Sequence, residues 1–337
     1  MLIPGKPRHQ NLKNILCITN LSTKPAIKNT RKKSSLTNFL CLYDGLKLRS
    51  WNQEYVKWLL SEKQFELFKF EEIRRSNKPS IFVGKCNNLD ILIKSTKKGW
   101  YVDISGSIHK WMNDGKHNHN DFYWKDFLVV YDEIVDTLCM EPSEMKIVNL
   151  ELGVNCVLPD YVKFTIAQLL ENVLSLAGKF DVKSHNYDKK SDRCKVDMCE
   201  RYIKMYNKAI QNGIPYEILR FEIGFKKSRK IEKDVGVFYF NDLKKEAIRE
   251  KGIKLLIKEF NTLLIYPPDF LERIPVALSE EDREIHQYPK REFWGSLKKR
   301  KGSEFKKTLS KFTRLVNQYC SYNIKDEVLE ILADKLR

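Results

Sequence analysis

Alternating apolar and polar residues recur in short runs along the first two thirds of the chain. Short runs typical of strands span residues 80–85, 89–94 and 99–105, and the alternation itself is seen at residues 101–105, 148–154, 201–208 and 219–226. Alternation with period two is typical of strands that bury one face against a core. Turn sequences at Asn87-Asn88 and Lys97-Lys98-Gly99 separate the first three runs and favour an antiparallel meander. LCLYDGLKL, from Leu40, is predicted to be a further strand that Gly45 interrupts.

Helical spacing marks the remaining segments. Residues 51–70 are mostly helical in pattern, and residues 121–140 contain the clearest helix, which is expected to begin at Asn120 or Asp121 as N-cap. A helix is also expected near residues 160–175, and the chain becomes mainly helical after about residue 230. These patterns predict an α+β protein with a largely antiparallel sheet, helices on one face and a helical C-terminal region.

Three regions follow from the changes in composition. Residues 1–36 form a basic arm with eight lysines and arginines and no acidic residue. Residues 37–230 form the α+β domain, and residues 231–337 form a basic helical region. A length of 337 residues is compatible with about two folded domains.

The charge balance indicates a polyanionic partner. The chain has 61 Lys+Arg against 44 Asp+Glu, a formal charge of +17, which favours nucleic acid before an anionic membrane surface. No apolar run is long enough for a membrane span. Eight cysteines without a CxxC pair are expected to be free thiols in a reducing cytoplasm. A P-loop, a GxSxG elbow and an HExxH motif are all missing.

If the alternating strands share one sheet, their polar residues gather on a single face. These residues are Asp103, Glu151, Glu222, Tyr202, Tyr206, Lys204, Lys208 and Arg220. Carboxylates can hold a hard divalent cation, a tyrosine hydroxyl can attack phosphorus, and lysine and arginine can neutralise phosphates. The alternative is an ordinary antiparallel sheet with one wet face, which gives the same alternation.

Several short motifs occur in a characteristic order between residues 40 and 226. They are Gly106-Ser107 with Lys110 and Trp111, then Glu151, Tyr206-Asn207-Lys208 and Arg220-Phe221-Glu222. In this order they resemble replication initiation proteins of rolling-circle phages and plasmids, nearest to the filamentous-phage gene II and related plasmid initiator group. Asn207 departs from the usual aspartate, and the acidic strand reads Asn149-Leu150-Glu151.

The resemblance implies a phage or plasmid initiator that nicks and rejoins DNA at a specific site. It implies a covalent 5′-phosphotyrosine, a divalent cation (Mg²⁺ or Mn²⁺), and origin DNA and host replication proteins as partners. The domain at 37–230 is then the nicking and DNA-binding domain. The implied roles are catalytic for Tyr202, Tyr206 and Lys208, metal-binding for Glu151, Glu222 and Asp103, and nucleic-acid-binding for Lys204, Arg220 and Lys110.

The nucleophile is left open among three tyrosines, with Tyr202 preferred over Tyr206 and Tyr187. Other rolling-circle enzymes use a His-hydrophobic-His pair, which is missing. His117 and His119 are interpreted as solvated loop residues, whereas His109 is expected nearer to the sheet. The alternative functions are a non-catalytic sequence-specific DNA-binding protein on the same scaffold and a basic RNA-binding or structural protein.

A basic segment in the C-terminal region is a second candidate for DNA contact. Residues 290–314 contain ten basic and two acidic side chains, with apolar residues at helical spacing. Contact with duplex phosphates is expected at Lys298, Lys299, Arg300 and Lys301. Changing these four residues to alanine should weaken binding and flatten its salt dependence. A solvated pair of helices is the alternative.

Overall fold

The computed structural model describes most of the chain after the predicted basic arm. The described residues are 39–73, 80–158, 164–175, 183–184, 193–267, 269–273, 280–299, 302–320 and 323–336. The arm at 1–36, Tyr187, Arg300 and Lys301 lie outside them, and so do the side chains of Lys298 and Lys299.

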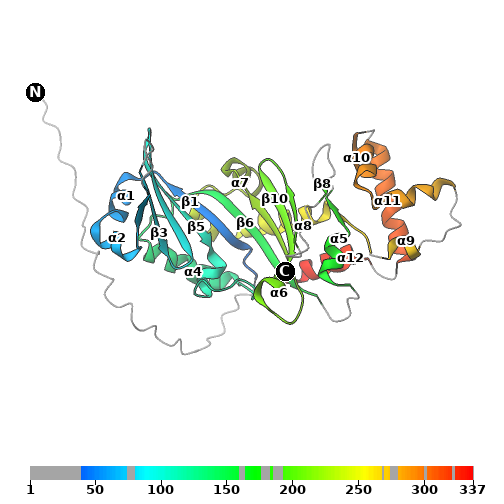
Figure 1. The fold of residues 1–337 in the computed structure, drawn as a ribbon, viewed down its shortest axis with the longest axis horizontal. Helices are drawn as coiled ribbons and strands as arrows, with labels where there is room; N and C mark the ends of the chain where they lie inside the picture. The colour runs from blue at the N-terminus through cyan, green and yellow to red at the C-terminus, as the bar shows by residue number, and fades with distance from the viewer. Residues whose placement is uncertain are drawn as a thin grey trace, which may run out of the picture. The chain divides into compact units, whose positions relative to one another are not determined.

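Nine antiparallel strands form the main sheet, in the order β2-β3-β4-β5-β1-β6-β11-β10-β9 (Figure 1). The strands are β1 (Tyr43–Ser50), β2 (Glu71–Ile73), β3 (Ile81–Cys86), β4 (Leu89–Thr96), β5 (Gly99–Ser107), β6 (Lys146–Val157), β9 (Arg193–Asp197), β10 (Arg201–Asn207) and β11 (Ile218–Phe225). The predicted meander is β3-β4-β5. The predicted α+β class and largely antiparallel sheet are confirmed.

Helices lie on one face of this sheet and also make up most of the C-terminal region. They are α1 (Gln53–Leu59), α2 (Glu62–Leu67), α3 (Ile108–Met112), α4 (Trp124–Thr137), α5 (Ile166–Glu171), α6 (Lys208–Asn212), α7 (Ser228–Val235), α8 (Glu246–Asn261), α9 (Phe270–Arg273), α10 (Arg291–Lys299), α11 (Gly302–Tyr319) and α12 (Ile324–Leu336). The described residues also form two 3-10 helices, η1 (Phe240–Lys244) and η2 (Glu280–Gln287), and a small sheet of β7 (Val173–Ser175), β8 (Lys183–Ser184) and β12 (Leu263–Ile265).

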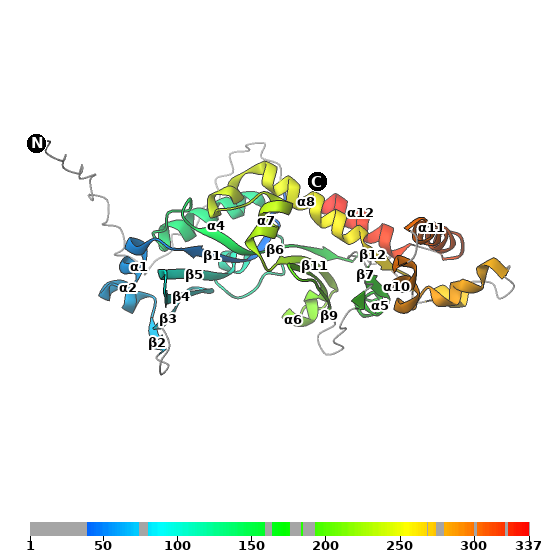
Figure 2. The same ribbon diagram turned by 90° about the horizontal axis from the view of Figure 1, so that it is seen from above.

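The main core lies between the sheet and the helices α4, α7, α8 and α12 (Figure 2). Leu150, Leu152 and Ile223 point into it from the strands and are fully buried. Each such side chain stabilises the fold by roughly 1.5–3 kcal/mol relative to an exposed one. Because α8 and α12 pack on β6, helices beyond residue 230 cover the same sheet that carries the polar face. Among the described residues, α6 and the 113–120 loop lie against the opposite face, which we call the open face because the long helices α4, α8 and α12 do not cover it (Figure 2).

A second, smaller core lies among α9, α10, α11 and the small sheet. Trp294 is its centre: the indole Nε1 donates a hydrogen bond to the carbonyl of Tyr288 at 2.6 Å, and the ring packs edge-on against Phe312. This cluster explains the apolar spacing seen in residues 290–314. The predicted pair of helices around Gly302 is present as α10 and α11.

Several local details differ from the expectations. Gly45 does not end the first strand, because a bulge between Tyr43 and Leu46 lets β1 continue through it. α4 starts after Tyr123, whose backbone N–H donates to Asp126 at 3.2 Å, so neither Asn120 nor Asp121 is its N-cap.

Two further segments are shorter than expected. The helix near 160–175 is described only as α5, because residues 173–175 pair with β12. The strand predicted at residues 201–208 is β10, which ends at Asn207. Lys208 begins α6, because the Asn207 side chain accepts from the N–H of Ala209 and caps that helix.

Candidate active site on the open face of the sheet

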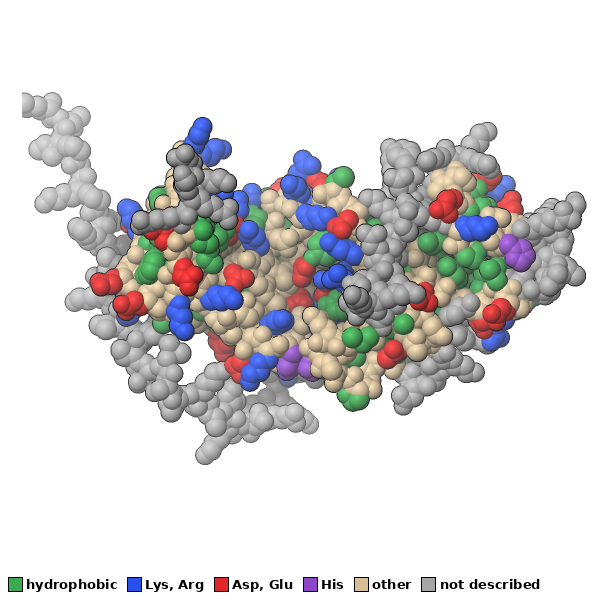
Figure 3. Space-filling view, in the orientation of Figure 1, with side chains coloured by type: hydrophobic (Ala, Val, Ile, Leu, Met, Phe, Trp, Pro, Cys, Tyr) green, Lys and Arg blue, Asp and Glu red, His purple; other side chains and the backbone are tan. Residues whose placement is uncertain are grey.

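The strand register brings most of the predicted site residues to one place on the open face. Lys204 lies opposite Glu222, and Tyr206 lies opposite Arg220. On the other side of β11, Glu222 faces Gly153 of β6. The polar parity seen in the sequence therefore corresponds to one continuous surface, on which acidic and basic side chains alternate across the middle of the sheet (Figure 3).

Glycines on three strands let long side chains lie flat across their neighbours. A Cβ at Gly153 would lie 2.7 Å from the guanidinium carbon of Arg220. A Cβ at Gly224 would collide with the Tyr202 ring, and one at Gly45 would collide with the Glu151 carboxylate. Arg220 thus crosses β6, and Tyr202 meets Glu151 across β11. The glycines are part of the site because they determine which side chains can reach across a neighbouring strand.

Arg220 is the centre of a buried ionic network. Its guanidinium donates to Asp44 Oδ2 at 2.6 Å, to Glu222 Oε1 at 2.9 Å and to Asn155 Oδ1 at 3.1 Å. The side chains of Arg220, Asp44 and Glu222 are almost completely removed from solvent. Burial of such charges is tolerated only when they are paired and hydrogen-bonded, as they are here.

Asp44 is a site residue that the sequence analysis did not select. Besides Arg220, its carboxylate accepts from the Asn118 amide at 2.7 Å and from the Ser107 hydroxyl. Strand parity counted from Leu46, which is buried in the core, would place Asp44 on the core face. The bulge in β1 turns it toward the open face instead. The available signal was an acidic residue beside a glycine, at a position that strand parity assigns to the core.

Tyr202 and Glu151 form a hydroxyl–carboxylate pair. The Tyr202 hydroxyl donates to Glu151 Oε1, and both side chains are half-buried. Burial, with the nearby charges of Glu222 and Asp44, raises the pKa of Glu151. Burial and the Glu151 charge also raise the pKa of Tyr202. The tyrosine is therefore protonated at neutral pH, and the carboxylate best placed to accept its proton is Glu151.

Tyr206 belongs to the neighbouring Glu222 group. Its hydroxyl donates to Glu222 Oε1 at 2.9 Å and accepts from Lys208 Nζ at 3.4 Å. Arg220 and Lys204 lower the pKa of Glu222 to about 2 despite its burial. Burial lowers the pKa of Lys208 to about 8. Glu222 is consequently a weak base, and Lys204 forms an ion pair with it.

The remaining predicted residues lie at different distances from this group. Asp103 is on the same face but is held by Arg49, at 2.6 Å, and by Lys47, at 2.8 Å. It lies two strands from Glu151 and roughly 17 Å along the sheet, by register. The structure does not bring Asp103 together with the two glutamates. Lys110 is in α3, near enough for its charge to lower the pKa of Lys208.

The histidines of the 113–120 loop are partly shielded from solvent, which corrects the expectation that they are solvated. His117 and His119 are half-buried, with ring centroids 4.1 Å apart and both Nδ1 atoms buried. The loop folds back onto the sheet because the Asn155 amide donates to the carbonyls of Asn118 and His119, at 3.2 and 3.0 Å. His109 is next to the sheet, as expected: it is buried, stacks on Phe122 and hydrogen-bonds Asn120.

A methyl group at residue 224 should disturb the site from within. Because a Cβ there overlaps the Tyr202 ring, Gly224→Ala should force that ring off Glu151 and lower the free energy of unfolding by about 1–3 kcal/mol. Gly295→Ala is the matched control, since a Cβ there meets nothing and alanine favours the helix. Urea unfolding measures both; equal stability of the two variants would contradict the close approach.

Acid should destabilise the protein through His109. Burial lowers the pKa of His109 to about 4, against about 6.5 for a free histidine. Between these values the unfolded chain binds a proton that the folded one does not, so stability falls as pH falls, by up to about 1.4 kcal/mol per pH unit. His109→Gln should reduce the difference in unfolding free energy between pH 7 and pH 5. An unchanged difference would contradict the assignment.

The donor set can be tested against a divalent cation. Within the described residues, no three His, Cys, Asp or Glu side chains are arranged as ligands of one ion. Mg²⁺ nevertheless often uses one or two carboxylates, with water and substrate phosphate completing its shell. Glu151 fits such an ion, because the described residues provide no lysine or arginine in ion-pair contact with it, and burial and the Glu222 carboxylate raise its pKa.

Comparisons with known proteins add a distant structural likeness. No family model and no curated protein matches the sequence. A solved structure, titled as that of the rolling circle replication initiator protein from Geobacillus stearothermophilus, is similar over 72% of this chain and 89% of that chain, with 14% identity and a TM-score of 0.38. At this TM-score the likeness by itself establishes no activity for this chain. In the described part of the chain, no helix has the length and apolar character of a membrane span.

Proposed function

We propose that this protein is a replication initiator of a phage or plasmid that nicks and rejoins DNA through a tyrosine. The observation that carries the proposal is the Tyr202–Glu151 pair on an open, basic sheet face. A nucleophile in contact with a carboxylate of raised pKa is the arrangement that covalent catalysis requires. The motif order described above supports the same reaction class.

The reaction follows from the atoms at the pair. The Tyr202 oxygen attacks phosphorus while its proton passes to Glu151. The bond from phosphorus to the 3′ oxygen breaks, that oxygen leaves with the electron pair and takes a proton from water, and the 5′ phosphate stays on the tyrosine. A 3′ hydroxyl attacking the phosphotyrosine reverses these steps and rejoins the strand. Lys204, whose ammonium lies over the Tyr202 ring at 5.8 Å, is placed to attract the phosphate.

Tyr202 is preferred to Tyr206 because their carboxylate partners differ. Glu222, beside Tyr206, has a pKa of about 2 and is neutralised by Arg220 and Lys204. We assign positioning roles to the hydrogen-bonded group of Tyr206, Lys208, Arg220 and Glu222.

A divalent cation, Mg²⁺ or Mn²⁺, is part of the proposal. Glu151 would hold it through Oε2, since Oε1 accepts from Tyr202, and when bound it would neutralise charge on the phosphate. Glu222 would be the second carboxylate only if it gave up its ion pairs with Arg220 and Lys204. Asp103 would likewise have to give up Lys47 and Arg49, and it lies away from both glutamates, so it is the least favoured of the three acids. DNA is the proposed partner, with host replication proteins acting on the free 3′ end in the reducing cytoplasm.

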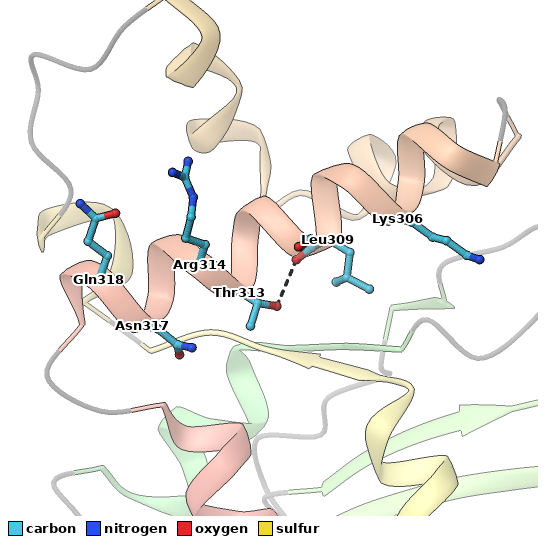
Figure 4. A pocket seen from close by; sticks show the side chains of 7 residues that line it. Lys306, Leu309, Thr313, Arg314, Asn317 and Gln318 are labelled. Carbon is cyan, nitrogen blue, oxygen red and sulfur yellow. Dashed lines mark hydrogen bonds between the residues drawn. The ribbon is translucent and has the colours of Figure 1, made fainter.

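A second DNA contact is proposed at α10–α11. Here a shallow hollow of about 800 Å³ follows α11, with Lys306 and Arg314 among its lining residues (Figure 4). Both of its charged lining residues are basic, as contact with the phosphates of duplex DNA requires.

Supercoiled DNA carrying the origin, cut in the presence of Mg²⁺ or Mn²⁺, tests the proposal. Relaxed circles with protein attached to a 5′ end are expected, and chelation of the cation should stop their formation. Binding without nicking would instead favour the alternative, a non-catalytic DNA-binding protein on this scaffold.

A further inference from the structure

A stack of one cation and two aromatic rings lies on the same open face, away from the tyrosines. The Arg49 guanidinium lies 4.3 Å from the centroid of the Tyr101 ring. The Trp51 ring lies on Tyr101 as well, with centroids 4.9 Å apart and planes tilted by 47°. Asp103 fixes the guanidinium with two hydrogen bonds, of 2.6 and 2.8 Å.

The outer member of this stack is exposed. Trp51 is 44% accessible to solvent, whereas Tyr101, beneath it, is 8% accessible. The Tyr101 ring holds the indole on one side, and Tyr101 is itself held by the Arg49–Asp103 pair. A rigid ring with one free face is the feature that a nucleobase recognises by stacking.

The stack is connected to the candidate active site by charge. Arg49 lies opposite Lys146 on β6, five residues before Glu151, so that Arg49 is about 17 Å along the sheet from the Tyr202–Glu151 pair, and Trp51 lies two residues beyond it. Lys47 lies between them on β1, and Lys94 lies opposite Tyr101 on β4. Asp103 is the acidic residue paired with Arg49 and Lys47, and Lys94 and Lys146 add two further positive charges around it.

We propose that Trp51 is a base-stacking platform for the single-stranded DNA that flanks the nicked phosphate, a few nucleotides from it. This inference rests on the proposed function for the identity of the strand. Phosphates would follow Lys47 and Lys146, while one base would stack on Trp51. Duplex DNA would not use this contact, because its bases are already stacked on one another.

Binding of a fluorescein-labelled dT20 oligonucleotide to the full chain, with chelator present so that no cleavage occurs, tests the platform. Stacking of one base is worth about 1–3 kcal/mol, so Trp51→Ala should raise the dissociation constant about 5-fold to 150-fold. The slope of affinity against salt should stay unchanged, because no phosphate contact is lost. Trp51→Phe should retain most of the affinity.

Two controls make the result specific. Val129→Ala removes an exposed apolar side chain, 59% accessible, from α4 on the helical side of the sheet, and should change nothing. A duplex of the same length should bind wild type and Trp51→Ala equally. Unchanged single-strand affinity in Trp51→Ala, or an equal loss for the duplex, would overturn the platform.

Tryptophan fluorescence gives a second measurement that does not depend on the alanine variant. Quenching by dT20 should be clear in the wild type and much smaller in Trp51→Phe at saturation. Equal quenching in both would also overturn the platform. Failure of the proposed nicking activity with these binding results intact would leave the platform in place, so the two proposals fail separately.

Discussion

Tyr202→Phe is expected to abolish the covalent protein–DNA adduct while the protein still folds and binds DNA. The variant removes only the hydroxyl that donates to Glu151 and keeps the ring that lies across Gly224. Without that oxygen no phosphotyrosine can form, so adduct formation should fall by at least about 10³-fold, to background. Denaturing gel electrophoresis of the protein with labelled origin DNA and Mg²⁺ measures the adduct.

Tyr206→Phe is the matched control, because it removes the same atom from the same strand four residues away. It breaks the hydrogen bond to Glu222 but leaves the Tyr202–Glu151 pair intact. We expect it to slow adduct formation without abolishing it. Full activity in Tyr202→Phe together with none in Tyr206→Phe would assign the nucleophile to Tyr206, whose hydroxyl lies beside Lys208.

Arg220→Met should cause the largest loss of stability among single substitutions on the open face. It leaves the carboxylates of Asp44 and Glu222 buried without the cation that joins them. Removing one partner of a buried pair costs about 3–5 kcal/mol, because an uncompensated charge remains inside the protein. Urea unfolding at pH 7 measures the loss.

Lys204→Met is the comparison for this effect. Lys204 also pairs with Glu222, but its side chain is 20% accessible, and Arg220 still neutralises the carboxylate when Lys204 is gone. A loss of about 1 kcal/mol or less is expected. Similar losses for both variants would show that the buried network is not centred on Arg220.

The alternation of polar residues was sufficient to predict the open face. Period-two patterns place Glu151, Tyr202, Lys204, Arg220 and Glu222 on one side of their strands, because side chains of a strand alternate without exception unless a bulge intervenes. Such a pattern fixes the face of a residue but not its neighbour. Order and distance within the face depend on strand pairing, which the sequence does not contain locally.

Where the prediction fell short, a bulge, a glycine or an ion pair was responsible. The bulge in β1 brings Asp44 onto the open face against simple parity. The missing Cβ of Gly224 pairs Tyr202 with Glu151, a partner on the next strand but one. Asp103 has the expected parity, but Lys47 and Arg49 hold it at a different part of the sheet.

The most direct measurement is mass spectrometry of the trapped protein–DNA adduct after digestion with protease and nuclease. The account predicts that a nucleotide is attached through its 5′ phosphate to the Tyr202 oxygen of the peptide that contains this residue. Attachment at Tyr206, at Tyr187 or at a serine, or the lack of any adduct from DNA that has been nicked, would contradict it.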